Sequence, residues 1–136
     1  MTPQRMDELV DAHIGAEASN DVTAAVAVYT DDVEHDVVGA PDGVLHGPDA
    51  ASHRYEQLLK ELRQDELITA RRHHGEDFCV VEHKVTCTVT GQFAGIPGNG
   101  RQVSFRMLHL FEFREDAISR ENVWMDTTGA MAQLRA

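Results

Sequence analysis

The clearest pattern of apolar and polar residues lies in the last third of the chain. From Phe105 to Phe113, side chains at alternate positions are apolar except for His109, and this period of two is typical of a strand with one buried face. A second alternating run ends at Met125, and the polar segment 114–117 separates the two runs. The stretch therefore predicts two long strands joined by a tight turn.

Opposite charges predict how these two strands pair. Placing Glu112 opposite Arg120 also places Leu108 opposite Trp124, whereas a shift by one residue loses the charge pair. In this register one face of the hairpin carries Phe105, Met107, His109, Phe111, Phe113, Ser119, Glu121, Val123 and Met125. Because most of these side chains are apolar, we expect the face to be buried.

The remaining elements follow from the spacing of apolar residues, which recur every three or four positions in helices and alternate in strands. In chain order the predicted elements are helices over 4–18, 22–29 and 48–62, strands over 33–38, 66–74 and 78–90, and a short last helix over 127–134. The strand 33–38 precedes the third helix. Asp126 is interpreted as the N-cap of the last helix rather than as a catalytic acid.

The order of these elements predicts the fold class. Three helices come first, and strands in immediate succession follow, which favours antiparallel pairing. We therefore expect an α+β fold in which three N-terminal helices pack on a curved antiparallel sheet, with a short C-terminal helix. A sheet that curves over helices leaves a cavity between the two layers, where small ligands bind.

Composition and charge narrow the class of protein. A chain of 136 residues with 42% hydrophobic residues is long enough for one globular domain with a core. Its formal net charge of −11 repels phosphate backbones and anionic membranes, so we expect no nucleic-acid or membrane partner, although the charge also simply favours solubility. No apolar run approaches the ~20 residues of a transmembrane helix, and the polar N-terminus lacks a signal-peptide core, so a cytoplasmic location is expected.

Several motifs together resemble a known family. The stretch TVTGQFAGIPGNGRQVSFRMLHLFEF, the later AISRENVWMD and the final Gln133-Leu134 are similar to the SnoaL-like branch of the nuclear transport factor 2-like superfamily. The resemblance implies that residues 1–136 form a single SnoaL-like domain with a cone-shaped fold, a pocket beneath the concave sheet face, and frequent dimers. The superfamily includes cyclases, isomerases, epoxide hydrolases, dehydratases and binding proteins without catalytic activity, so the fold alone does not define the activity.

The resemblance also implies positions for catalytic residues. In the polyketide cyclases and related members, an acid–base aspartate lies midway along the last strand, and the matching position here is Val123. The epoxide hydrolases carry an Arg and an Asp two positions apart on the long strand, which match His83 and Val85. This chain therefore has neither constellation.

His109 and Glu121 are the candidate catalytic pair. They are expected to be diagonal neighbours on the inner face, close enough for the carboxylate to orient the imidazole for general acid–base chemistry. Other side chains are expected to line the pocket: His35, Tyr55, His83, Met107, Val123 and Met125. Inward histidines and a glutamate suit either proton transfer or a metal site, but no HxH or HxxxH spacing supports a metal, and none is expected.

The structural alternative is that these polar residues only stabilise the core. An inward histidine is often hydrogen-bonded to the backbone or to water, and a bulge would turn Glu121 outward. The outer face of the hairpin carries Leu108, Leu110 and Trp124, which predicts a homodimer through the sheet, or a C-terminal tail that covers the patch.

Two functions remain open from the sequence. The first is a pocket protein that acts on a small, largely apolar organic molecule by cofactor-free proton transfer of the isomerase, cyclase or hydratase kind, with His109 as acid or base and Glu121 orienting it. The second is a module that binds a small ligand without converting it, which the valine at position 123 favours.

Overall fold

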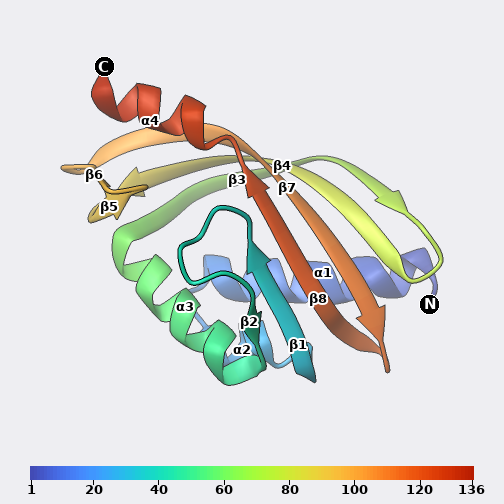
Figure 1. Cartoon of the computed structure of the whole chain (residues 1–136). Helices are drawn as coiled ribbons and strands as arrows, with labels where there is room; N and C mark the ends of the chain where they lie inside the picture. Colours follow the sequence, from blue (N-terminus) through green and yellow to red (C-terminus); the bar gives the residue numbers. More distant parts are fainter.

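Helices and strands follow one another along the whole chain, and the computed structural model describes residues 1–136 (Figure 1). In chain order the elements are α1 (Pro3–Ala18), α2 (Val22–Val26), β1 (Tyr29–Val37), β2 (Leu45–His46), α3 (Pro48–Glu61), β3 (Leu62–His74), β4 (Phe78–Val89), β5 (Gln92–Phe93), β6 (Ile96–Pro97), β7 (Arg101–Arg114), β8 (Ala117–Met125) and α4 (Thr127–Arg135). The predicted α+β class is confirmed.

The main sheet has six strands in the order β2-β1-β8-β7-β4-β3, and its long strands arch over α1 in Figure 1. The expectation of an antiparallel sheet is wrong at one place, because β1 pairs with β8 in parallel. A short direct connection between strands requires antiparallel pairing, but most of the chain lies between β1 and β8, so their direction is free. The sheet is therefore mixed.

The predicted hairpin register is confirmed. Glu112 pairs with Arg120, and Leu108 pairs with Trp124. The Arg120 side chain lies 3.6 Å from the Glu112 carboxylate, and it also contacts carboxylates on β1, including that of Glu34. Charge complementarity across the strands therefore agrees with the pairing that the sequence favours.

A β-bulge changes the end of this hairpin. Between Glu112 and Phe113 the register shifts, so that Ile118 lies opposite Phe113 and is fully buried. Ser119, which was expected on the inner face, is only partly buried. A bulge adds one unpaired residue and reverses the facing of those beyond it, which accounts for the difference.

Side-chain caps mark the first residues of α1, α2 and α4. The Thr2 hydroxyl accepts a hydrogen bond from the backbone N–H of Arg5 at the start of α1. The Asp126 carboxylate accepts from the N–H of Gly129 at 2.9 Å, so its predicted role as an N-cap is confirmed. Tyr29, predicted to end the second helix, begins β1 instead. None of the helices combines the length and apolar character that a membrane crossing needs.

Two separate hydrophobic clusters form the core. The first joins α1, α3 and the sheet and consists of Met6, Leu9, Val10, Tyr29, Val33, Ala51, Tyr55, Cys79, Val81, Phe111, Phe113 and Ile118. The second packs α4 on the other part of the sheet and consists of Val85, Cys87, Val89, Phe93, Val103, Phe105, Ala130 and Leu134. Residues of both clusters, Tyr55, Val85, Cys87 and Phe105 among them, also line a cavity between the helices and the sheet.

Candidate functional site

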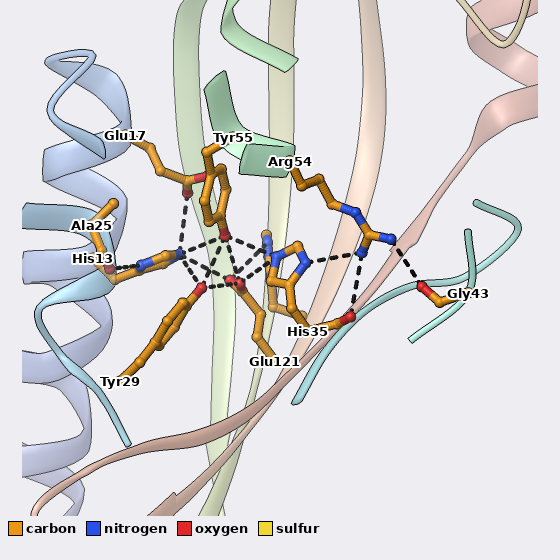
Figure 2. A network of polar contacts seen from close by, with 10 residues as sticks. His13, Glu17, Ala25, Tyr29, His35, Gly43, Arg54, Tyr55 and Glu121 are labelled. Carbon is orange, nitrogen blue, oxygen red and sulfur yellow. Dashed lines mark hydrogen bonds and ion pairs between the residues drawn. The ribbon is translucent and has the colours of Figure 1, made fainter. Parts of the chain in front are cut away.

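A cavity of about 350 Å³ lies between the helices and the concave face of the sheet, and most of its lining side chains are apolar. Its polar lining includes Glu17 from α1, His35 from β1, Tyr55 from α3 and His109 from β7. These side chains belong to one buried polar cluster, of which Figure 2 shows a large part. An apolar cavity with a few convergent polar groups is the usual form of a small-molecule site.

Glu121 lies at the centre of the cluster, only 1% exposed, and the hydroxyls of Tyr29 and Tyr55 each donate to its Oε2 at 2.7 Å (Figure 2). His35 Nε2 lies 3.0 Å from the same oxygen. Burial alone would raise the pKa of Glu121, but the charge of His13 and the contacts of both histidines hold it well below its usual range. Glu121 is therefore a buried anion.

His13 supplies the positive charge beside this anion. Its Nδ1 lies 2.7 Å from the carbonyl oxygen of Ala25, which can only accept, so Nδ1 carries a proton. Its Nε2 lies 3.1 Å from Glu121 Oε1 and 3.5 Å from Glu17 Oε2. Burial lowers the pKa of His13, but the two carboxylates outweigh burial and raise it to about 10. The ring is therefore an imidazolium between two carboxyl groups.

His35 is held in one tautomer by Arg54. The guanidinium Nη1 donates to His35 Nδ1 at 3.0 Å, so Nδ1 is an acceptor and Nε2 carries the ring proton toward Glu121. Arg54 is itself fixed by Asp42, whose carboxylate accepts from Nη2 at 2.8 Å. This second layer of contacts holds the His35 ring in place at the cavity wall.

His109 lines the cavity as a neutral imidazole. Its Nδ1 lies 3.1 Å from Nδ1 of His83, and its ring stacks on Phe111 with centroids 5.3 Å apart. Burial lowers the pKa of His109 to about 4, since the nearby Glu121 charge offsets burial only in part. The ring is therefore uncharged at neutral pH.

The predicted contact between His109 and Glu121 is only partly realised. The register makes them diagonal neighbours, with His109 opposite Val123 and Glu121 opposite Phe111. However, His109 Nε2 lies 3.9 Å from Glu121 Oε1, too far for a hydrogen bond. The hydrogen bonds to the carboxylate come instead from tyrosines of β1 and α3, whose hydroxyls donate to Oε2. Glu121 Oε1 faces the imidazolium of His13, whose Nε2 lies 3.1 Å away.

The structure places the other predicted site residues as follows. His35, Tyr55, Met107, Val123 and Met125 line the cavity. His83 does not line it, because the ring lies fully buried against His109, and burial lowers its pKa to about 4. Glu121 does not line it either, since it lies behind the rings that surround it.

Sequence reasoning did not identify Glu17 or His13 as site residues. Both lie on α1, where the positions of Met6, Val10, His13 and Glu17 follow a spacing of three or four residues. A histidine and a glutamate that continue the apolar stripe of a helix face the core, and this pattern could have indicated a buried polar site. Burial raises the pKa of Glu17 to about 7; the charge of His13 lowers it and that of Glu121 raises it further.

Comparison with known proteins identifies the family. The model of the family described as "SnoaL-like polyketide cyclase" matches residues 6–134. The chain belongs to this family. No protein of curated function matches this SnoaL-like chain in sequence.

Solved structures share the SnoaL-like fold at low sequence identity. A putative polyketide cyclase from Xanthomonas campestris pv. campestris is 20% identical with a TM-score of 0.83, covering 96% of this chain and 97% of that one. A putative SnoaL-like polyketide cyclase from Jannaschia sp. CCS1 is 18% identical with a TM-score of 0.84, covering 100% and 96%. An epoxide hydrolase of M. tuberculosis, described as LEH-like, is 15% identical with a TM-score of 0.76, covering 97% and 90%.

In this SnoaL-like chain the cavity offers two groups for proton transfer. Val123 lines the cavity at the position where the resemblance implies an acid–base aspartate, and a valine can neither give nor take a proton. His109 and Glu17 line the same cavity and differ in protonation, one being a neutral base and the other a carboxyl group with a raised pKa. Such a pair suits acid–base chemistry.

Proposed function

We propose that this SnoaL-like protein converts a small, largely apolar organic molecule by acid–base chemistry of the isomerase, cyclase or hydratase kind, without a cofactor. One observation carries the proposal. The neutral ring of His109 lines an apolar cavity, and 3.9 Å behind it lies Oε1 of Glu121, a buried anion. A buried anion at this distance stabilises the positive charge that the ring gains when it takes a proton.

The proposed role of His109 follows from its two nitrogens. When Nδ1–H donates to Nδ1 of His83, Nε2 keeps its lone pair and can accept a proton from the ligand. The resulting imidazolium carries its positive charge 3.9 Å from Glu121 Oε1, so that the buried carboxylate stabilises the charge that the reaction creates. Glu121 then acts by electrostatics on His109 rather than on the ligand.

Exchange of hydrogen for deuterium tests this proposal without knowledge of the natural ligand. Cyclohexanone and tetralone are neutral, apolar ketones, and exchange at the carbon next to the carbonyl reports proton removal. We expect the wild type to accelerate exchange above buffer, and His109→Ala to lose this acceleration by about a hundredfold or more. Proton NMR of the ketone in deuterium oxide measures the rate.

His46→Ala is the matched control, because His46 is an exposed histidine of β2 outside the cavity lining. It should exchange the ketones at the wild-type rate, and circular dichroism should show that both variants are folded. Wild-type rates in His109→Ala would rule out His109 as the base.

A second candidate function is binding without conversion. Val123, at the position where the resemblance implies the family's aspartate, favours it, because the cavity would then hold an apolar ligand without a group aligned for reaction. Ketones that bind in the cavity with no exchange above buffer would support this second function over the first.

We also propose that two copies of the chain pair through the outer face of the sheet. Leu108 and Trp124 lie opposite each other on β7 and β8 and are 37% and 41% exposed. Beside them Arg106 and Glu82 form an ion pair of 3.2 Å. An apolar centre with both signs of charge at its edge suits a two-fold interface, in which each patch meets a copy of itself.

A further inference from the structure

Glu17 is the one carboxyl group that both lines the cavity and contacts the buried charge cluster. It projects from the last turn of α1, its side chain is 21% exposed, and its Oε2 lies 3.5 Å from His13 Nε2. Figure 2 shows Glu17 at the Nε2 end of the His13 ring, whereas Ala25 lies at the Nδ1 end. A ligand in the cavity can therefore meet this carboxyl group directly.

The charges around Glu17 decide its protonation. Three groups face it: His13 from its own helix, Glu121 from β8 and the Tyr55 hydroxyl from α3. His13 carries one positive charge, and Glu121, which is closer to it, is already an anion. A second carboxylate beside one imidazolium has no cation of its own, so Glu17 is the group that holds a proton most easily.

His109 lines the same cavity from β7, but it can accept a proton where Glu17 can give one. It is neutral, with Nδ1 engaged by His83, and gains a stabilising neighbour in Glu121 only when Nε2 takes a proton. A molecule that fills a cavity of about 350 Å³ touches both walls. A carboxyl group that can give a proton and an imidazole that can take one are therefore available to a single ligand.

We infer that Glu17 is the general acid of this cavity and that its ligand is a neutral carbonyl compound. This inference rests on the proposed acid–base function of His109. Glu17 gives its carboxyl proton to the carbonyl oxygen of the ligand, while His109 Nε2 takes a proton from the adjacent carbon. The electrons of the broken C–H bond form a carbon–carbon double bond, and those of the carbonyl double bond move to oxygen. The product is an enol, which can isomerise or attack a second carbonyl group of the same molecule.

The lining also favours a neutral ligand over an anionic one. Glu61 and Asp42 reach the cavity as further carboxylates, and the guanidinium of Arg54 is already engaged by Asp42 and His35. No lining cation is therefore free to neutralise a ligand carboxylate or phosphate. A carbonyl oxygen instead needs only a hydrogen-bond donor, which protonated Glu17 provides.

The pH dependence of ketone exchange tests the role of Glu17. Because the pKa of Glu17 is raised to about 7, kcat/KM of the wild type should fall above that pH as the acid loses its proton. Glu17→Gln keeps the shape but has no proton to give, so exchange should drop about a hundredfold or more and the fall near pH 7 should disappear. Glu17→Asp keeps an acid and should retain the fall at a lower rate.

Glu8→Gln is the matched control, because Glu8 is an exposed glutamate of α1 outside the cavity lining. It should keep the wild-type rate and pH profile. If Glu17→Gln also keeps them while His109→Ala is inactive, Glu17 is not the acid and the proposed function stands without it. A wild-type rate that rises through pH 7 would make Glu17 a base and overturn the inference. If the wild type exchanges neither ketone above buffer, the proposed function and this inference both fail.

A carbon-13 NMR titration of the Glu17 carboxyl carbon provides a second readout that needs no turnover. The carboxyl group should titrate near pH 7, with Glu17→Gln used to assign the signal. Titration in the ordinary acidic range would exclude a protonated Glu17 at neutral pH and with it the role of general acid.

Discussion

Among single residues, Glu121 is the buried anion that two tyrosines and two histidines surround, and its charge raises the pKa of His13. Replacing it by glutamine removes the charge and keeps the shape. We expect the pKa of His13 to fall far below about 10 in Glu121→Gln, because burial would then outweigh the remaining attraction of Glu17. Nitrogen-15 NMR of the His13 ring measures this change.

The same substitution should lower the free energy of unfolding by about 3 kcal/mol at neutral pH, because it breaks a buried ion pair. Folding raises the His13 pKa from 6.5 to about 10, so this contribution is complete below the lower value and is lost as the pH rises toward the upper one. Urea denaturation should therefore show wild type and variant converging in alkaline solution. Glu112→Gln, an exposed change on β7, should have little effect, and a pH-independent difference would contradict the assignment of the His13 charge.

The sequence predicted the inward position of the Glu121 side chain but not its partners. Alternation along β8 gives the facing of a side chain, and facing is a local property of the strand. The contact with His13 requires α1 to pack close to β8, and no local pattern in the sequence predicts that arrangement. For the same reason the sequence does not predict Glu17 as a site residue, although Glu17 lies four residues after His13, one helical turn away.

Among the elements, the turn between β7 and β8 has a backbone that its residues do not favour. Glu115 and Asp116 both have positive φ angles, of 56° and 58°, in a two-residue turn that favours Asn and Gly. Glu115→Asn should raise the free energy of unfolding by about 0.5 to about 1 kcal/mol, because asparagine tolerates this conformation better. Chemical denaturation measures the difference.

Asp116 is left unchanged in this variant because its carboxylate accepts two hydrogen bonds from Arg5, at 2.7 and 2.9 Å. Glu76→Asn in the turn before β4 is the control, since Glu76 is exposed and has no positive φ. A gain of the same size in the control would show that the effect does not arise from the backbone of the β7–β8 turn.

Pairing along the hairpin was predictable, whereas its irregularities were not. The opposite charges of Glu112 and Arg120 predict the register, and the two residues do pair. The bulge that buries Ile118 depends on how the hairpin end meets α1 and β1, which alternation does not report. Alternation of apolar and polar residues does not indicate the relative direction of two strands either, so the sequence did not predict the parallel pairing of β1 with β8.

For the whole molecule, the exposed patch around Trp124 leads to a prediction about assembly. We expect the wild type to sediment as a dimer and Trp124→Glu as a monomer, because a carboxylate at the centre of the patch would be buried without a partner. Analytical ultracentrifugation over a range of concentrations distinguishes the two. Val44→Glu, an exposed apolar residue before β2, should remain dimeric, and a monomeric wild type would refute the proposed interface.

The overall architecture was the most predictable level. The order of helices and strands, together with the family motifs, was sufficient for the α+β class and the pocket beneath the sheet. The chemical character of the pocket was less accessible, because it depends on which of several buried groups keeps a proton. That outcome is decided by distances such as the 3.1 Å between His13 and Glu121, which exist only in the folded chain.

The parallel pairing of β1 with β8 has a consequence for the order in which the protein takes shape on the ribosome. Tyr29 pairs with Ile118, so β1, which is synthesised early, can complete this pairing only after β8 has been synthesised near the end of the chain. His13, Tyr29, His35 and Tyr55 all emerge before the carboxylate of Glu121 that they surround. A nascent chain can form its helices and the β3–β4 hairpin, yet its polar cluster stays incomplete until β8 is synthesised.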